Sequence, residues 1–148
     1  MINKNHHVYS GGKILERAKF NYLIQIIKDY PNVPKYLHER EDEILHPWRE
    51  RDKNIGGGRA TPSNGQERLL VKLSDDRRLN AIRTQYDAVG RCLANTDPDT
   101  FRIINELYLK PRTTLTVDGV ADLLHMPTPT VRKRKSRFVE TLADELGI

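Results

Sequence analysis

Residues 116–146 read TVDGVADLLHMPTPTVRKRKSRFVETLADEL and decide the fold of the C-terminal part of the chain. Thr116 has a side chain suited to capping a helix, and the apolar residues that follow it recur at helical spacing. Residues 125–127, HMP, interrupt this pattern, and Thr128 can cap a second helix whose first residue is Pro129. Two short helices with small apolar faces cannot bury themselves separately, so we expect them to pack crosswise as a helix-turn-helix.

The second helix of this pair is strongly basic, and no acidic residue lies between Thr128 and Phe138. A solvated face on an ordinary helical hairpin would explain the charge, but not the tight turn and the caps together. In helix-turn-helix proteins the N-terminal end of the second helix enters the major groove of DNA. The side chains expected to reach base edges or the nearest phosphates are Thr128, Thr130, Arg132 and Lys133. The side chains expected to face the flanking phosphates are Arg134, Lys135 and Arg137.

The composition agrees with a small, helix-rich protein that binds a polyanion. The 148 residues suit one domain or two very small ones, and 25 Lys+Arg against 20 Asp+Glu give a formal net charge of +5. No apolar run is long enough to span a membrane, and the N-terminus lacks the order of a signal peptide, so we expect a cytoplasmic protein. Cys92 is the only cysteine, which excludes an intramolecular disulfide and a cysteine metal framework.

Upstream of residue 96 the sequence predicts further helices, and therefore an all-α protein. Helical periodicity over residues 13–29 and 32–46 indicates an N-terminal helical region, residues 1–46. Residues 47–65 contain Trp48 and a glycine triplet but no periodicity, which is typical of a loop.

Residues 66–95 form one helical pattern, followed by a C-terminal DNA-binding domain, residues 96–148. In that domain Asp97 can cap a short helix that begins at Pro98. A single helix of that length would reach roughly 45 Å, which is long for a small domain. Either residues 74–76, SDD, break the helix, or it projects and pairs with a second copy of the chain. The apolar seam that would support such pairing consists of Ile82, Tyr86, Val89 and Leu93.

The C-terminal motif resembles a known class of DNA-binding regions. From Thr116 onward the sequence is similar to the fourth region of bacterial sigma factors and to response-regulator domains, which share the pattern TxxEVAxxLxVSxxTVRxxxxRxxxxL. The match has no gaps but is generic, so it implies a DNA-binding helix-turn-helix and little about the biological role.

A more specific resemblance lies upstream, to the RinA family of phage transcriptional activators. Its motifs occur here in the same order: DYPN at residues 29–32, PW at 47–48, NIGG at 54–57 and PSN at 62–64. With the sigma-like C-terminus, the resemblance covers most of residues 28–148. It implies activation of phage late genes, the packaging and morphogenesis operons, by a protein bound near the promoter. The second helix of the motif has its own sequence here, so the operator does not carry over.

We therefore expect a sequence-specific DNA-binding regulator of transcription that needs no cofactor or metal and is not an enzyme. Its expected partners are double-stranded DNA and bacterial RNA polymerase, with homodimer formation left open. The main alternative is a small terminase subunit, which would form a large ring that light scattering distinguishes from a monomer or dimer. A nuclease or other enzyme built on His6 and His7 is disfavoured, because adjacent histidines point to different sides and have no carboxylate partners.

Overall fold

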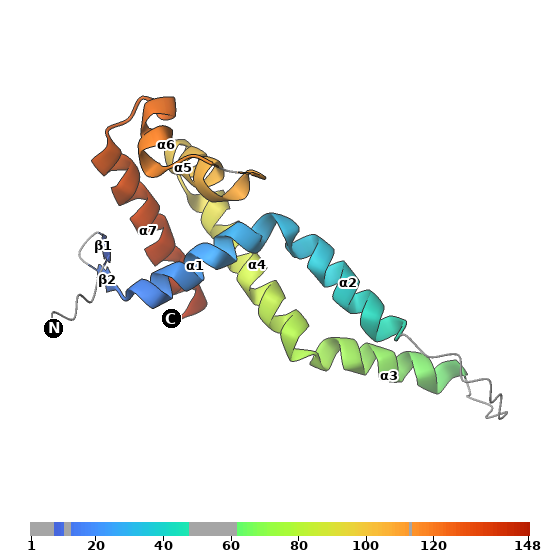
Figure 1. The fold of residues 1–148 in the computed structure, drawn as a ribbon. Helices are drawn as coiled ribbons and strands as arrows, with labels where there is room; N and C mark the ends of the chain where they lie inside the picture. Colours follow the sequence, from blue (N-terminus) through green and yellow to red (C-terminus); the bar gives the residue numbers. More distant parts are fainter. Residues whose placement is uncertain (1–7, 11–12, 48–61, 113) are drawn as a thin grey trace, which may run out of the picture. The chain divides into compact units, whose positions relative to one another are not determined.

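The computed structural model describes residues 8–10, 13–47, 62–112 and 114–148, and it confirms the predicted all-α class. Within these residues the only extended structure is a ribbon of two short antiparallel strands, in which Val8 pairs with Leu15 and Ser10 with Lys13. The elements, in chain order (Figure 1), are β1 Val8–Ser10, β2 Lys13–Leu15, α1 Arg17–Asp29, the 3-10 turn η1 Tyr30–Asn32, α2 Val33–Leu45, α3 Pro62–Asp75, α4 Arg77–Asn95, α5 Pro98–Ile104, the π-helical turn η2 Asn105–Leu109, α6 Val117–Leu124 and α7 Thr128–Leu146.

The chain groups into two compact units whose limits differ from the domains expected from the sequence. One unit is Asn32–Thr84, and the other combines Met1–Pro31 with Gln85–Ile148. The second of these joins both ends of the chain because α1, the end of α4 and α7 share one core. The boundary between the units falls within α4, so residues 96–148 are not a separate compact unit.

The larger core of the combined unit is built from α1, α4 and α7. In α1, Phe20, Leu23 and Ile27 are buried at intervals of three and four residues, which places them on one helical face. They meet the buried face of α7, including the fully buried Leu142. Figure 1 shows α1 and α7, at opposite ends of the sequence, close to one another.

A second, smaller core in the same unit joins the end of α5, η2, α6 and the first part of α7. Its buried residues are Ile103, Leu107, Val120, Ala121 and Val131. The small side chain of Ala121 is only 3% exposed, which fits the close crossing of α6 and α7 expected from the sequence. Since α7 contributes to both cores, its position is fixed along most of its length.

The other unit contains α2, α3 and the start of α4, and it shows where the predicted long helix ends. Asp76 lies between α3 and α4, and its carboxylate accepts a hydrogen bond of 2.9 Å from the backbone N–H of Leu79. This bond caps α4, so the expected break at residues 74–76 is confirmed and a single helix over 66–95 is wrong. Asp76 also forms an ion pair of 2.9 Å with Arg40 of α2, and Arg83 of α4 forms another with Glu41.

The apolar seam suggested for self-pairing is largely used within the chain. Val89 is fully buried, Leu93 packs against the larger core, and the Tyr86 ring stacks on Tyr30 with ring centroids 4.7 Å apart. These three side chains therefore make contacts within the chain, although Tyr86 and Leu93 are only partly buried. Pairing of a second copy through this seam stays a prediction.

Two element boundaries also differ from the prediction. The helix expected to begin at residue 13 begins at Arg17, because Lys13–Leu15 pairs with β1 and Glu16 has an extended backbone. The loop expected to end at residue 65 ends earlier, since α3 begins at Pro62. Trp48, the glycine triplet and the pair His6 and His7 lie outside the described residues.

Candidate nucleic-acid interface

The turn between α6 and α7 is fixed by backbone hydrogen bonds at the end of α6. Thr116 caps the start of that helix as expected, and its hydroxyl accepts a bond of 3.2 Å from the N–H of Gly119. At the other end His125 has a left-handed backbone, with φ 54°. The N–H of Met126 then bonds to the carbonyl of Ala121 at 3.0 Å, which is the Schellman arrangement.

The second helix begins one residue earlier than the sequence suggested. Thr128 is the first residue of α7 and not its cap, because the capping position belongs to Pro127, which has no side-chain hydrogen bond to offer. Pro129 still occupies the first turn, where its missing N–H is not needed. Thr128 and Thr130 are both partly buried. The predicted capping role of Thr128 is therefore wrong.

Three of the seven predicted site residues lie along the solvent-facing side of α7. Thr130, Lys133 and Arg137 follow one another at intervals of three and four residues, so they share one face of the helix. Lys133 and Arg137 are exposed, and neither forms an ion pair with any described residue. The opposite face holds the buried Val131 and Val139. We call Thr130, Lys133 and Arg137 the outward stripe.

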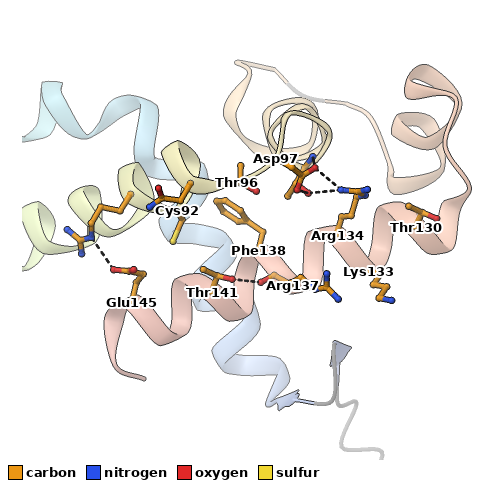
Figure 2. Close-up of a pocket in the computed structure, with 13 residues that line it drawn as sticks. Cys92, Thr96, Asp97, Thr130, Lys133, Arg134, Arg137, Phe138, Thr141 and Glu145 are labelled. Atoms are coloured by element: carbon orange, nitrogen blue, oxygen red, sulfur yellow. Dashed lines mark hydrogen bonds and ion pairs between the residues drawn. The ribbon is translucent and has the colours of Figure 1, made fainter.

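Arg134 lies beside the outward stripe but is engaged with α5. Its guanidinium forms an ion pair of 2.7 Å with Asp97 and a weak hydrogen bond of 3.4 Å to the Thr100 hydroxyl. Asp97 in turn caps α5 by accepting the Thr100 N–H at 3.0 Å. Figure 2 shows Arg134 directed at Asp97, while Lys133 and Arg137 point away from it. The pKa of Asp97 is lowered by the Thr100 hydroxyl first and by the Arg134 charge to a smaller extent.

Arg132 and Lys135 are placed on a different side of α7 from the outward stripe. The ammonium of Lys135 lies 5.5 Å from the centre of the Phe20 ring of α1, a cation–π contact. Burial lowers the pKa of Lys135, and the nearby charge of Arg132 lowers it further. Arg132 itself is exposed. Arg132 and Lys133, which we expected to reach base edges together, therefore lie on different faces of the helix. The same is true of Lys135 and Arg137, which we expected to face the flanking phosphates together.

A groove of about 500 Å³ lies between α7 and the corner where α4 meets α5. Two acidic side chains in it are each paired with an arginine: Glu145 with Arg91 at 3.0 Å, and Asp97 with Arg134. Both pairs are drawn in Figure 2. The other polar side chains that line the groove are Asn95, Thr96, Thr100, Thr130, Lys133, Arg137 and Thr141. Basic residues thus outnumber acidic ones around the groove, whose lining also includes Cys92 and Phe138.

Sequence reasoning missed Arg91, Asp97 and Glu145 as parts of this surface. The Asp97-Pro98 pair was identified, but only as the start of a helix. Its contact with Arg134 joins residues 37 positions apart, and local periodicity gives no sign of such a pairing.

The described residues offer little support for other classes of site. No three histidine, cysteine or acidic side chains among them come together as a metal would require. No helix in the described part of the chain is long and apolar enough to cross a membrane.

Comparisons with known proteins agree with the resemblance seen in the sequence. Residues 19–144 match a family model described as "Protein of unknown function (DUF722)". A curated relative, "Transcriptional activator rinA" of Staphylococcus phage phi11, is 30% identical over 121 residues, which cover 80% of this chain and 84% of the relative. No solved structure matches the chain. The match to the family model and the identity to that relative confirm the predicted resemblance, and the chain belongs to the DUF722 family of RinA-like proteins.

Proposed function

We propose that this protein is a phage transcriptional activator that binds duplex DNA through α6 and α7. The observation that carries the proposal is the outward stripe, whose two cations are exposed on a helix held rigidly by two cores. Lys133 and Arg137 form no ion pair with a described residue, so their charge is available to a polyanion. The name of the relative from phage phi11 supports the activator role.

In this proposal α6 and α7 act as a helix-turn-helix, and the first half of α7 enters the major groove. Lys133 and Arg137 lie on the helix face opposite the buried Val131, so they face the DNA. Thr130 is partly buried and is placed at the edge of that contact. Arg132 and Lys135 then face the sugar–phosphate backbone on one flank, which fits their separate side of the helix.

We further propose that the target genes are phage late genes and that the protein acts together with the RNA polymerase of the host. This part rests on the resemblance of residues 28–148 to the RinA activators. The sigma-like sequence of α6 and α7 fits a site near a promoter, where the polymerase is within reach.

The test is selection of bound fragments from the genome that encodes the protein, followed by binding measurements on the selected duplex and on random DNA. Replacing Lys133 and Arg137 together by glutamine should weaken binding to the selected duplex and reduce its preference over random DNA. The matched control replaces Arg68 and Lys72, which are exposed on α3 and carry the same charges. If the full chain binds no duplex, or if both double variants bind equally well, the proposal is wrong.

Activation is measured separately, by transcription in vitro from a selected promoter with host RNA polymerase. The full chain should increase the transcript, and the Lys133/Arg137 double variant should not. A decrease in the transcript on addition of the full chain would indicate a repressor and contradict the activator role.

A further inference from the structure

The groove beside α7 contains two arginines that are paired with acids in a way that leaves donors unused. Arg134 uses one terminal amino nitrogen for both Asp97 and Thr100, and Arg91 uses its Nε for Glu145. A guanidinium has five N–H donors, arranged to grip a phosphate or carboxylate by two parallel hydrogen bonds. The contacts with described residues therefore leave each arginine with N–H donors that could bind a second anion.

Both ion pairs are open to solvent and can exchange partners at low cost. The side chains of Arg134 and Asp97 are 37% and 50% exposed, and those of Arg91 and Glu145 are 54% and 37% exposed. Water screens ion pairs at such positions, so they contribute little to stability. A phosphate that entered the groove would replace weak pairs and would not have to break a buried one.

The rest of the groove suits a phosphodiester chain more than a small apolar molecule. Lys133 and Arg137 line it, and the hydroxyl groups of Thr96 and Thr130 add donors. The Thr141 hydroxyl already donates to the carbonyl of Arg137 at 2.9 Å. Because Lys133 and Arg137 have no acidic partner among the described residues, the groove has an excess of positive charge. The outward stripe forms one wall, so the groove is continuous with the face proposed to enter the major groove.

We propose that one strand of the DNA backbone lies in this groove, where Arg91 and Arg134 bind phosphates. Asp97 and Glu145 hold these arginines in position in the unbound protein. When DNA binds, each arginine exchanges its carboxylate partner for a phosphate. This inference rests on the proposed function, and it adds Arg91 of α4 to a surface otherwise made by α7. It makes binding by these two arginines independent of DNA sequence, since phosphates carry no sequence information.

The first arm of the test removes each arginine in the full-length protein. Arg91→Gln and Arg134→Gln should each weaken binding to the selected duplex and to random duplex by the same factor, about tenfold for a lost charged hydrogen bond. Each should also flatten the slope of log affinity against log salt by about 0.9. Arg102→Gln is the matched control, because Arg102 is exposed on α5 and does not line the groove.

The second arm removes the competing acids and predicts the opposite sign. Asp97→Asn retains the cap of α5, because asparagine caps helices as well as aspartate does. It should tighten binding to both duplexes by up to about fivefold, and Glu145→Gln should do the same. If the pairs were only structural braces, these variants would leave the affinity unchanged or weaken it.

The outcomes separate this inference from the proposed function. If the full chain binds no DNA, the proposed function fails and this inference fails with it. If the chain binds DNA but Arg91→Gln and Arg134→Gln behave like Arg102→Gln, only the phosphate groove is wrong. Unchanged or weaker binding by Asp97→Asn and Glu145→Gln also overturns it. Thermal unfolding of every variant by circular dichroism identifies a loss of affinity that comes from a loss of folding.

Discussion

Replacing His125 by glycine should stabilise the protein, because this histidine occupies a backbone conformation that favours glycine. His125 ends α6 with φ 54° and ψ 45°, and the two hydrogen bonds of the Schellman turn hold it there. A left-handed conformation costs a non-glycine residue about 1–2 kcal/mol. Glycine loses about 0.5–1 kcal/mol more conformational freedom on folding, which offsets part of this gain. We therefore expect a net stabilisation of about 0.5–1 kcal/mol.

Thermal unfolding followed by circular dichroism measures this change as a rise in Tm of about 1–4 °C for a chain of this size. Gly147→Ala provides the reverse change, because Gly147 has φ 70° in a second Schellman turn and an added Cβ would meet no atom within 4 Å. Its Tm should fall, and by a smaller amount, since the last residues of a helix fray easily. A His125→Gly protein with an unchanged or lower Tm would refute the assignment of strain to this turn.

Three further predictions concern the cores and the capped break between α3 and α4. Leu142→Ala should lower the free energy of unfolding in urea by about 2–5 kcal/mol, because the side chain is fully buried between α1, α4 and α7; a smaller loss would mean that this core is not tightly packed. Asp76→Ala should destabilise more than Asp76→Asn, since only asparagine keeps the cap on Leu79. The pKa of Asp76 is lowered by that N–H first and by Arg40 second. The stabilisation that the Asp76 carboxylate gives the folded chain should therefore be complete above the ordinary carboxyl pKa and lost as the pH falls through the folded-state value. If the free energy of unfolding of the native chain and of both variants fell in parallel with acid, this would be contradicted. Burial raises the pKa of Cys92 to about 11, so iodoacetamide should alkylate the folded chain near neutral pH much more slowly than the urea-unfolded chain, and equal rates would show that the thiol is accessible.

The sequence predicted those features that depend on neighbouring residues. The caps at Asp97 and Thr116 follow from side chains that bond to an N–H three residues later, and both are present. The break near residue 76 was one of two alternatives, because local pattern shows where a helix can stop but not whether it does. The solvent-facing side of α7 could be identified only from the structure. The burial of Val131, Phe138 and Leu142 in two separate cores decides which basic side chains remain exposed to solvent.

Features that depend on distant residues could not be predicted. No periodicity relates α1 to α7, so the grouping of both chain ends into one unit was not expected. Helical spacing alone already places Lys135 on a different face from Arg137, but only the structure shows that Lys135 lies over the Phe20 ring of α1. Helical spacing alone places a basic residue on a helix but does not show which neighbouring helix covers it.

If α7 binds DNA as we propose, its participation in two cores limits how DNA specificity can change. Its first half completes the small core through Val131, and its second half completes the large core through Leu142. A chimaera with the whole of α7 from a relative would therefore also carry buried side chains that fit a different α1 and α4. Its larger core would pack less well, and the chimaera would be less stable. Grafting only positions 130, 133 and 137 avoids this conflict, because substitutions there leave both interiors intact. Under the proposed function, DNA preference can therefore change through a few positions of the outward stripe. A change in a buried residue of α7 would instead require a matching change in α1 or α4.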